Sequence, residues 1–236
     1  MDFKHFVIVG YGGIGSGVLD RVLQRTEVER VVVLSRSTHE HADPRVQFKQ
    51  GDVNCPETLA DLFAGVCNPC CVINTIGFLH GPEFRPEKRL ADVSKDALLH
   101  SIEVNTCSTI VLAQAIERSF SRKQAVALVA LSARVGSIGD NRAGGWLSYR
   151  VSKAALNMAV RTISVEWRRT RPLSSIIAYH PGTVDSQLST PFQASVPEGK
   201  LFSSAQAGKY LLDVIKQLET DDSGSFKAWD GSDIAW

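Results

Sequence analysis

A tyrosine and a lysine four positions apart, Tyr149 and Lys153, are suited by type and spacing to proton-transfer chemistry. Residues four apart lie on the same side of a helix, one turn from each other. A neighbouring cation favours the ionised form of a phenol and lowers its pKa from about 10. We therefore expect Tyr149 to act as a general acid. The alternative is a half-buried tyrosine beside a solvated lysine.

The helix that must carry this pair is predicted from Trp146 to about Thr170. Its apolar positions follow the spacing of one helical face: Leu156, Val160, Ile163 and Trp167. Basic residues at its end, Arg168 and Arg169, suit the negative end of a helix dipole better than a nucleic-acid site.

Glycines follow the first predicted strand, Phe6–Val9, and lead into the apolar stripe of a helix. They form a GxGxxG pattern, whose setting between a strand and a helix is typical of dinucleotide binding. Such a turn lets a pyrophosphate approach the N–H groups at the helix start. The alternative is a merely flexible turn. The predicted cofactor-binding residues of this turn are Gly10, Gly12, Gly13, Ile14 and Gly15.

Two further strand ends bear on the choice of cofactor. Arg36 follows the strand Val31–Leu34, where a site for NAD usually has an acid; an arginine there can pair with a 2′-phosphate, which favours NADP(H) over NAD(H). The alternative is a solvated arginine. Asp52 and Val53 follow the strand at residues 46–49 and are predicted to meet the adenine, although Asp52 could equally cap the next helix.

Composition excludes several classes of function. The chain has 236 residues with 44% apolar and 22% charged residues and a net charge of +1, as in a soluble globular protein without a broad nucleic-acid or membrane field. It has no apolar run long enough for a transmembrane helix and no signal-peptide layout. Cys67 and Cys70 have CxxC spacing without a second pair, so we expect no metal site and place the protein in the reducing cytoplasm.

The order of elements predicts an α/β fold. Seven apolar segments alternate with helices, which indicates a single-domain Rossmann fold over residues 1–236, with a doubly wound parallel sheet of about seven strands and helices on both faces. A long helix is expected at residues 97–120, interrupted by Asn105, a poor helix former. Asn105 is either exposed and unimportant, or it holds a water or bends the helix locally. Residues 187–202 are a candidate lid, and Ser203 opens a capping box.

Taken in order, these motifs resemble the short-chain dehydrogenase/reductase family from end to end. The resemblance rests on the glycine turn, Asn74–Gly77, Asn105, the Tyr149/Lys153 pair and Pro181-Gly182. Two stretches, Gly145–Asn157 and Trp229–Ser232, are most similar to the C-factor and sniffer-like carbonyl reductases.

The resemblance implies roles for individual residues. Tyr149 would donate a proton to a substrate carbonyl oxygen while NADPH delivers hydride. Lys153 would bind the nicotinamide ribose and lower the pKa of Tyr149. Asn105 would hold a water in a proton relay. The cofactor would also meet Asn74, Gly77, Pro181, Gly182 and Thr183.

This chain departs from the family pattern at two places. Its glycine turn is one residue shorter than the usual GxxxGxG. The family serine after the fifth strand falls on Ala133 by counting back from Gly136. We assign the catalytic serine to Ser132, with Ser137 as the alternative, and expect weaker catalysis if neither reaches the substrate.

These observations support an NADPH-dependent reductase of a small or apolar ketone or aldehyde. The candidate walls of its pocket are Phe78, Leu79, Trp146 and Phe192. One alternative is a dinucleotide-binding sensor or signalling protein with little turnover, because a fold alone does not establish catalysis. Another is a reductase of acyl-carrier-protein-linked substrates, docked by Arg134, Arg142 and Arg150. The resemblance also implies a homodimer or homotetramer formed through the two long helices.

Overall fold

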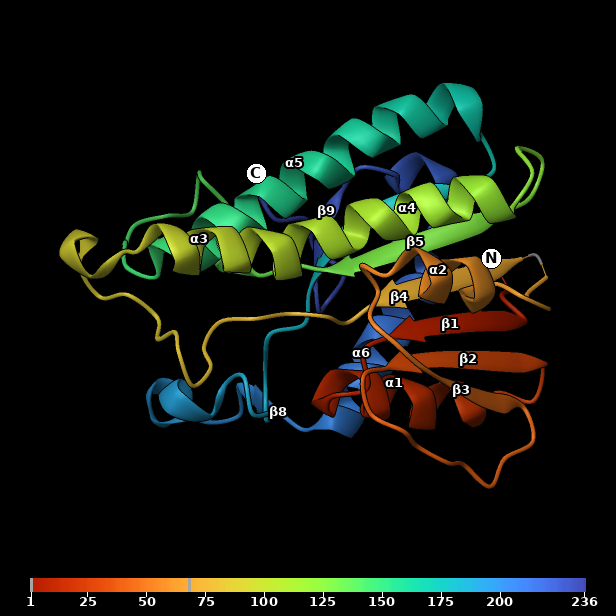
Figure 1. Cartoon of the computed structure of the whole chain (residues 1–236), viewed down its shortest axis with the longest axis horizontal. Coiled ribbons are helices and arrows are strands. Elements are labelled where there is room, and N and C mark those ends of the chain that lie inside the picture. The colour runs from red at the N-terminus through yellow and green to blue at the C-terminus, as the bar shows by residue number, and fades with distance from the viewer. Residues whose placement is uncertain (1, 68) are drawn as a thin grey trace.

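A seven-stranded parallel sheet forms the centre of the molecule (Figure 1). The computed structural model describes residues 2–67 and 69–236. The strand order is β3-β2-β1-β4-β5-β6-β9, with every neighbouring pair parallel. The strands are β1 (His5–Val9), β2 (Arg30–Ser35), β3 (Val46–Gln50), β4 (Cys70–Asn74), β5 (Val126–Leu131), β6 (Ser175–His180) and β9 (Phe226–Ala228). The predicted doubly wound Rossmann fold is confirmed.

Helices cover both faces of this sheet, and each face has its own apolar core. One core is closed by the helices α1 (Gly13–Leu23) and α6 (Ser204–Gln217). The other is closed by α2 (Pro56–Leu62), α4 (Ser108–Ser119) and α5 (Leu147–Thr170). The central strands are buried along their whole length, as expected of parallel strands covered on both sides.

The long helix expected at residues 97–120 is interrupted. It consists of α3 (Lys95–Ile102), a π-helical turn at Glu103–Cys107 and α4. The helix is thus interrupted at Asn105, as predicted, and because Asn105 is buried, the alternative of an exposed and unimportant residue is wrong. Turns of this type inside helices are frequent at functional sites.

The glycine turn is held against the far end of the chain by contact between two helices. A Cβ atom added at Gly17 of α1 would lie 1.9 Å from the Ser204 carbonyl oxygen. A Cβ atom added at Gly208 of α6 would lie 2.1 Å from the Gly17 carbonyl oxygen. Only glycines allow this approach. The predicted capping box is confirmed, since Ser203 and Gln206 exchange hydrogen bonds at the start of α6.

The candidate lid is anchored by a small second sheet. After β6 the chain forms β7 (Thr183–Val184), a 3-10 turn at Thr190–Ser195 and β8 (Leu201–Phe202), and β7 pairs with β8. This parallel pair was not predicted, because two-residue strands carry no periodicity.

Two further findings concern membrane-spanning helices and metal sites. None of the helices in the described residues is long and apolar enough to cross a membrane. The described residues likewise contain no group of three acidic, histidine or cysteine side chains placed to hold a metal ion. Asn68, inside the CxxC motif, lies outside the described residues.

Candidate active site

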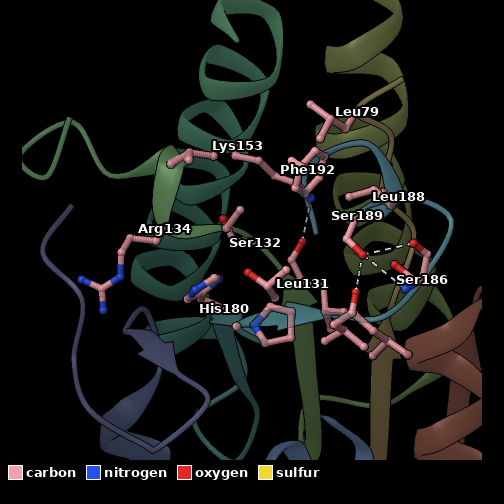
Figure 2. Close-up of a pocket in the computed structure, with 18 of the residues that line it drawn as sticks. Leu79, Leu131, Ser132, Arg134, Lys153, His180, Ser186, Leu188, Ser189 and Phe192 are labelled. Atoms are coloured by element: carbon pink, nitrogen blue, oxygen red, sulfur yellow. Dashed lines mark hydrogen bonds between the residues drawn. The ribbon is translucent and has the colours of Figure 1, made fainter. Parts of the chain in front are cut away.

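A cavity of about 430 Å³ opens at the carboxyl ends of the central strands (Figure 2). Parallel α/β sheets bind their ligands at this edge. The cavity is bounded by the ends of β4, β5 and β6, the start of α5 and the lid. Eight of the predicted site residues line it: Ile14, Gly77, Ser132, Tyr149, Lys153, Pro181, Gly182 and Thr183.

The helix α5 places Tyr149 and Lys153 on its buried side, as the four-residue spacing predicts. The Lys153 ammonium lies 5.8 Å from the centre of the Tyr149 ring and donates a hydrogen bond of 2.8 Å to the Leu131 carbonyl oxygen at the end of β5. Lys153 is 2% exposed. A long side chain is thereby held between its own helix and the sheet edge.

Burial governs the electrostatics of this pair. Burial raises the pKa of Tyr149 above its usual value near 10. Burial also lowers the pKa of Lys153 to about 7, because a buried ammonium loses its hydration. In the chain alone burial sets the direction of the Tyr149 shift, and the lowering of this pKa by Lys153 stays a prediction. Tyr149 is a neutral phenol at pH 7, which is the form that can donate a proton.

The first turn of α5 is held by a buried carboxylate that sequence reasoning missed. Glu87 is 6% exposed, and its carboxylate accepts hydrogen bonds from the hydroxyl and the backbone N–H of Ser148. The backbone carbonyl oxygen of Glu87 accepts a further hydrogen bond of 2.6 Å from the Trp146 N–H. A negative charge there matches the positive end of the helix dipole. Trp146 has a left-handed backbone, with φ of 52°, and its ring packs 5.0 Å from that of Phe192 in the lid.

The serines after β5 do not reproduce the family arrangement. Ser132 lines the cavity, but its hydroxyl donates a hydrogen bond of 2.6 Å to the Asn157 side chain. Ala133 also lines the cavity and offers no hydroxyl. The alternative candidate, Ser137, is buried outside the cavity lining, where its oxygen accepts a hydrogen bond from the Asp140 N–H.

Asn105 acts as a clamp behind the cavity. Its side chain accepts a hydrogen bond of 2.7 Å from the Phe78 N–H and donates to the Phe78 carbonyl oxygen and the Ser152 hydroxyl. Both of its N–H donors are therefore in use. A Cβ atom added at Gly77 would lie 3.8 Å from the Asn105 amide oxygen and 3.9 Å from the Lys153 side-chain nitrogen. Because Gly77 has no side chain, both polar groups face the space that a Cβ atom would fill.

Two predicted contact residues have their side chains elsewhere. The Asn74 amide lies outside the cavity lining and donates to the hydroxyls of Ser108 and Thr109, which joins β4 to the start of α4. Phe78 was expected to be a wall, but its ring packs against Phe84 and His100. The other expected walls do line the cavity: Leu79, Trp146 and Phe192.

The glycine turn has the shape that its pattern predicts. Gly10 has a left-handed backbone, with φ of 97°, and a Cβ atom at Gly15 would lie 2.2 Å from the Gly10 carbonyl oxygen. Nothing lies within 4 Å of the position of a Cβ atom at Gly12, the N-cap residue of α1. The turn is closed on its inner side and open above the start of the helix.

The predicted adenine end lies apart from the cavity. Arg36 is exposed just beyond β2 and makes no ion pair within the described part of the chain. Asp52 does not cap α2, whose N-cap is Cys55; it accepts a hydrogen bond from the Asn54 N–H instead. Val53 is buried in the core. Sequence reasoning missed three aromatic rings that cluster near this end: Tyr11, His39 and Phe48.

The arginines considered for a docking surface are partly engaged inside the chain. Arg134 pairs with Asp140, and Arg150 donates to the carbonyl oxygens of Gly144 and Gly145. They stabilise the loop before α5, which weakens the argument for a patch that recognises a carrier protein.

Two known proteins are similar to this chain in sequence. A 1-hydroxy-2-glutathionyl-2-methyl-3-butene dehydrogenase from Rhodococcus sp. (strain AD45) is 28% identical over 78% of this chain and 78% of its own length. The C-signal protein of Myxococcus xanthus is 28% identical over 62% of this chain and 83% of its own length.

Solved structures share the fold over its full extent. The carbonyl reductase Sniffer of D. melanogaster has a TM-score of 0.81 and 22% identity, with 100% of both chains covered. An NADPH-bound carbonyl reductase from chicken fatty liver has a TM-score of 0.82 and 22% identity, again with 100% of both chains covered. The family model described as enoyl-(acyl carrier protein) reductase matches residues 23–206. Because that match covers most of the sequence, the chain belongs to the short-chain dehydrogenase/reductase family of oxidoreductases.

Proposed function

We propose that this protein is an NADPH-dependent reductase of ketones or aldehydes, built from one dinucleotide-binding domain over residues 1–236. One observation carries the proposal: a single cavity is lined both by Tyr149 and Lys153 and by the segments expected to hold the nicotinamide, Gly77 and Pro181–Thr183. A proton donor and a hydride donor must meet at one carbonyl group, and this cavity has room for both.

The residues present fit a dinucleotide. The glycine turn leaves open space above Gly12 at the start of α1, where backbone N–H groups can bind a pyrophosphate. Arg36, exposed and free of ion pairs in the described chain, supplies a cation for a 2′-phosphate, which favours NADP(H). Asp52 and Val53 would lie beside the adenine. When bound, the reduced nicotinamide supplies the hydride for the carbonyl carbon.

The side chains of this protein supply the proton and its route. Tyr149, neutral at pH 7, donates its phenolic proton to the carbonyl oxygen as that oxygen gains negative charge. Lys153 binds the ribose hydroxyls, and an ammonium there stabilises the phenolate that remains. Asn105 keeps the loop at Phe78 in place, and water beside its amide oxygen returns a proton towards Lys153.

The walls of the cavity suit an apolar substrate. Leu79, Trp146, Leu188 and Phe192 surround the space in front of Tyr149. Since Phe192 belongs to the lid and contacts Trp146, the N-cap residue of α5, movement of the lid would open the cavity to the substrate and close it against water. We infer small aromatic or aliphatic ketones and aldehydes as the substrate class.

The test is NADPH oxidation with a panel of carbonyl compounds, run with the wild type and with Tyr149→Phe. Turnover should fall at least 10²-fold in the variant, because the ring keeps its packing and loses only the proton donor. NADPH affinity, measured by fluorescence titration, should stay within twofold. Equal losses of turnover and NADPH affinity would mean that Tyr149 is structural, and absence of wild-type turnover with every compound would refute the reductase.

A second candidate is a dinucleotide-dependent sensor with little turnover. Two observations favour it: Ala133 stands where the family has a serine, and the C-signal protein is among the relatives. Tight NADPH binding without turnover on any carbonyl compound would support this candidate.

We also propose a homodimer or homotetramer. Three apolar side chains of α5 spaced seven apart, Val151, Met158 and Val165, are 40%, 66% and 47% exposed. They form an apolar stripe on the outer side of α5, which a second copy of the chain would cover. The five free cysteines support a reducing, cytoplasmic location.

A further inference from the structure

A histidine at the edge of the cavity is not used by the mechanism above. His180 ends β6 and lines the same cavity as Tyr149. Its Nδ1 atom is buried and has no hydrogen-bond partner within the described part of the chain. A buried polar atom without a partner is destabilising, so such an atom in a cavity wall points to a partner that arrives with the ligand.

The sheet register fixes where this imidazole lies. Leu131 of β5 pairs with Tyr179 of β6, and the Ser132 N–H donates to the Tyr179 carbonyl oxygen, so Ser132 and His180 are neighbours across the two strands. Side chains alternate along a strand, and Ala178 faces the core beneath α5. His180 therefore faces the same side, towards the helix that carries Tyr149. Figure 2 shows His180 and Ser132 at the same edge of the cavity.

This is also the edge at which a hydrogen-bond donor is missing. Ala133 has no hydroxyl, and the Ser132 hydroxyl already donates to Asn157. When hydride is added to the carbonyl carbon, negative charge develops on the carbonyl oxygen, whose two lone pairs can each accept a hydrogen bond. Tyr149 serves one of them, and a second fixed donor stabilises the same charge.

We propose that the His180 imidazole replaces the serine of this family and donates a hydrogen bond to the carbonyl oxygen of the substrate. The inference rests on the proposed reductase function, whose site it completes. His180 keeps its hydrogen throughout, and the transferred proton comes from Tyr149. Burial, with Arg134 nearby, lowers the pKa of His180 to about 4, so the ring stays neutral and donates through one N–H across the physiological range.

The experiment compares wild type, His180→Leu and the double variant His180→Leu with Ala133→Ser. The first readout is kcat for NADPH oxidation. The second is the infrared C=O stretch of ¹³C-labelled acetophenone bound to the NADP⁺ complex, which measures hydrogen bonding to the oxygen without any turnover. We expect His180→Leu to lower kcat about 10²-fold and raise the stretching frequency. The serine in the double variant should recover at least tenfold in kcat and lower the frequency again. NADPH affinity should not change.

Each other outcome is decisive. An unchanged frequency and kcat in His180→Leu, or a loss of NADPH affinity equal to the loss of kcat, overturns the assignment. If the C=O stretching frequency depends on His180 but the protein reduces no carbonyl compound, the reductase is refuted and the His180 contact stands. If the protein reduces carbonyl compounds equally well with and without His180, the contact is refuted and the reductase stands. If acetophenone does not bind, the carbonyl compound that the wild type reduces fastest replaces it as the labelled ketone, and the same change in stretching frequency is expected. If His180→Leu fails to fold, the ¹⁵N resonances of the wild-type imidazole test the same contact, since they should shift when acetophenone binds.

Discussion

At the scale of single residues, burial acts on both members of the Tyr149/Lys153 pair: it raises the pKa of Tyr149 and lowers that of Lys153 to about 7. The four-residue spacing correctly brought Tyr149 and Lys153 into one cavity. It did not predict their ionisation, because pKa depends on burial, and burial follows from packing that no local pattern encodes. The same limit explains Ser132: its position was predicted, but its bond to Asn157 across the domain was not.

The ionisation of Lys153 makes stability depend on pH. Its pKa in the folded chain is about 7 against a usual 10.5, so between these values the unfolded state binds more protons and stability rises with pH. From pH 7 to pH 9, the free energy of unfolding of the wild type should rise by about 2 kcal/mol relative to Lys153→Met. Urea unfolding of both proteins without cofactor measures this difference. If the free energy of unfolding changes equally with pH in the two proteins, Lys153 is fully charged in the folded chain.

Cofactor choice is a second property of a single side chain. Arg36→Asp should weaken NADPH binding about 10–100-fold, because it removes a charged hydrogen bond to the 2′-phosphate and adds repulsion. NADH binding should change less than threefold. Fluorescence titration with both cofactors measures the ratio. The exposed Arg142, in the loop before α5, serves as the charge-matched control in Arg142→Asp. Equal losses for NADPH and NADH would contradict the assignment.

At the scale of elements, period and capping signals predicted the strands and helices well. They failed where a helix changes type: apolar periodicity runs through residues 97–120, yet the π-helical turn at Glu103–Cys107 divides it. In this turn the Asn105 side chain bonds to Phe78 and Ser152, which are far from it in the sequence, and a local pattern does not reveal such partners. A weak helix former indicated the position but not the geometry.

The clamp in this turn is testable. Asn105→Ala leaves the backbone groups of Phe78 without partners, so the free energy of unfolding should fall by about 1–3 kcal/mol. Turnover should fall as well, since the loop bearing Gly77 loses its support. Glu103→Ala, an exposed change in the same turn, should stay within about 0.5 kcal/mol. Chemical denaturation compares them, and similar small effects for both would rule out the clamp.

At the scale of the whole molecule, the alternation of strands and helices was sufficient to predict the parallel sheet and its two covered faces. Sequence alone could not say which apolar residues are left outside. The exposed stripe on α5 became visible only after folding, because Val151, Met158 and Val165 read as ordinary helix residues.

The apolar stripe on α5 predicts how a substitution within it changes the oligomeric state. Met158→Glu should convert the oligomer to a monomer, because a charge at the centre of an apolar contact is costly to bury. Leu90→Glu, at an apolar position that is 78% exposed on a different segment, should leave assembly unchanged. Light scattering coupled to size-exclusion chromatography gives the mass of each variant. A wild type that is already monomeric would refute the oligomer.

The glycine contact between α1 and α6 has a consequence for how the protein is made. Gly17 emerges from the ribosome long before Gly208, the residue it must touch, because the two are far apart in the sequence. Until then the helix under the glycine turn lacks one wall of its core. A nascent chain therefore cannot complete the packing of α1 before Gly208 has emerged, and a chain that stops before α6 would leave this apolar face exposed to proteolysis.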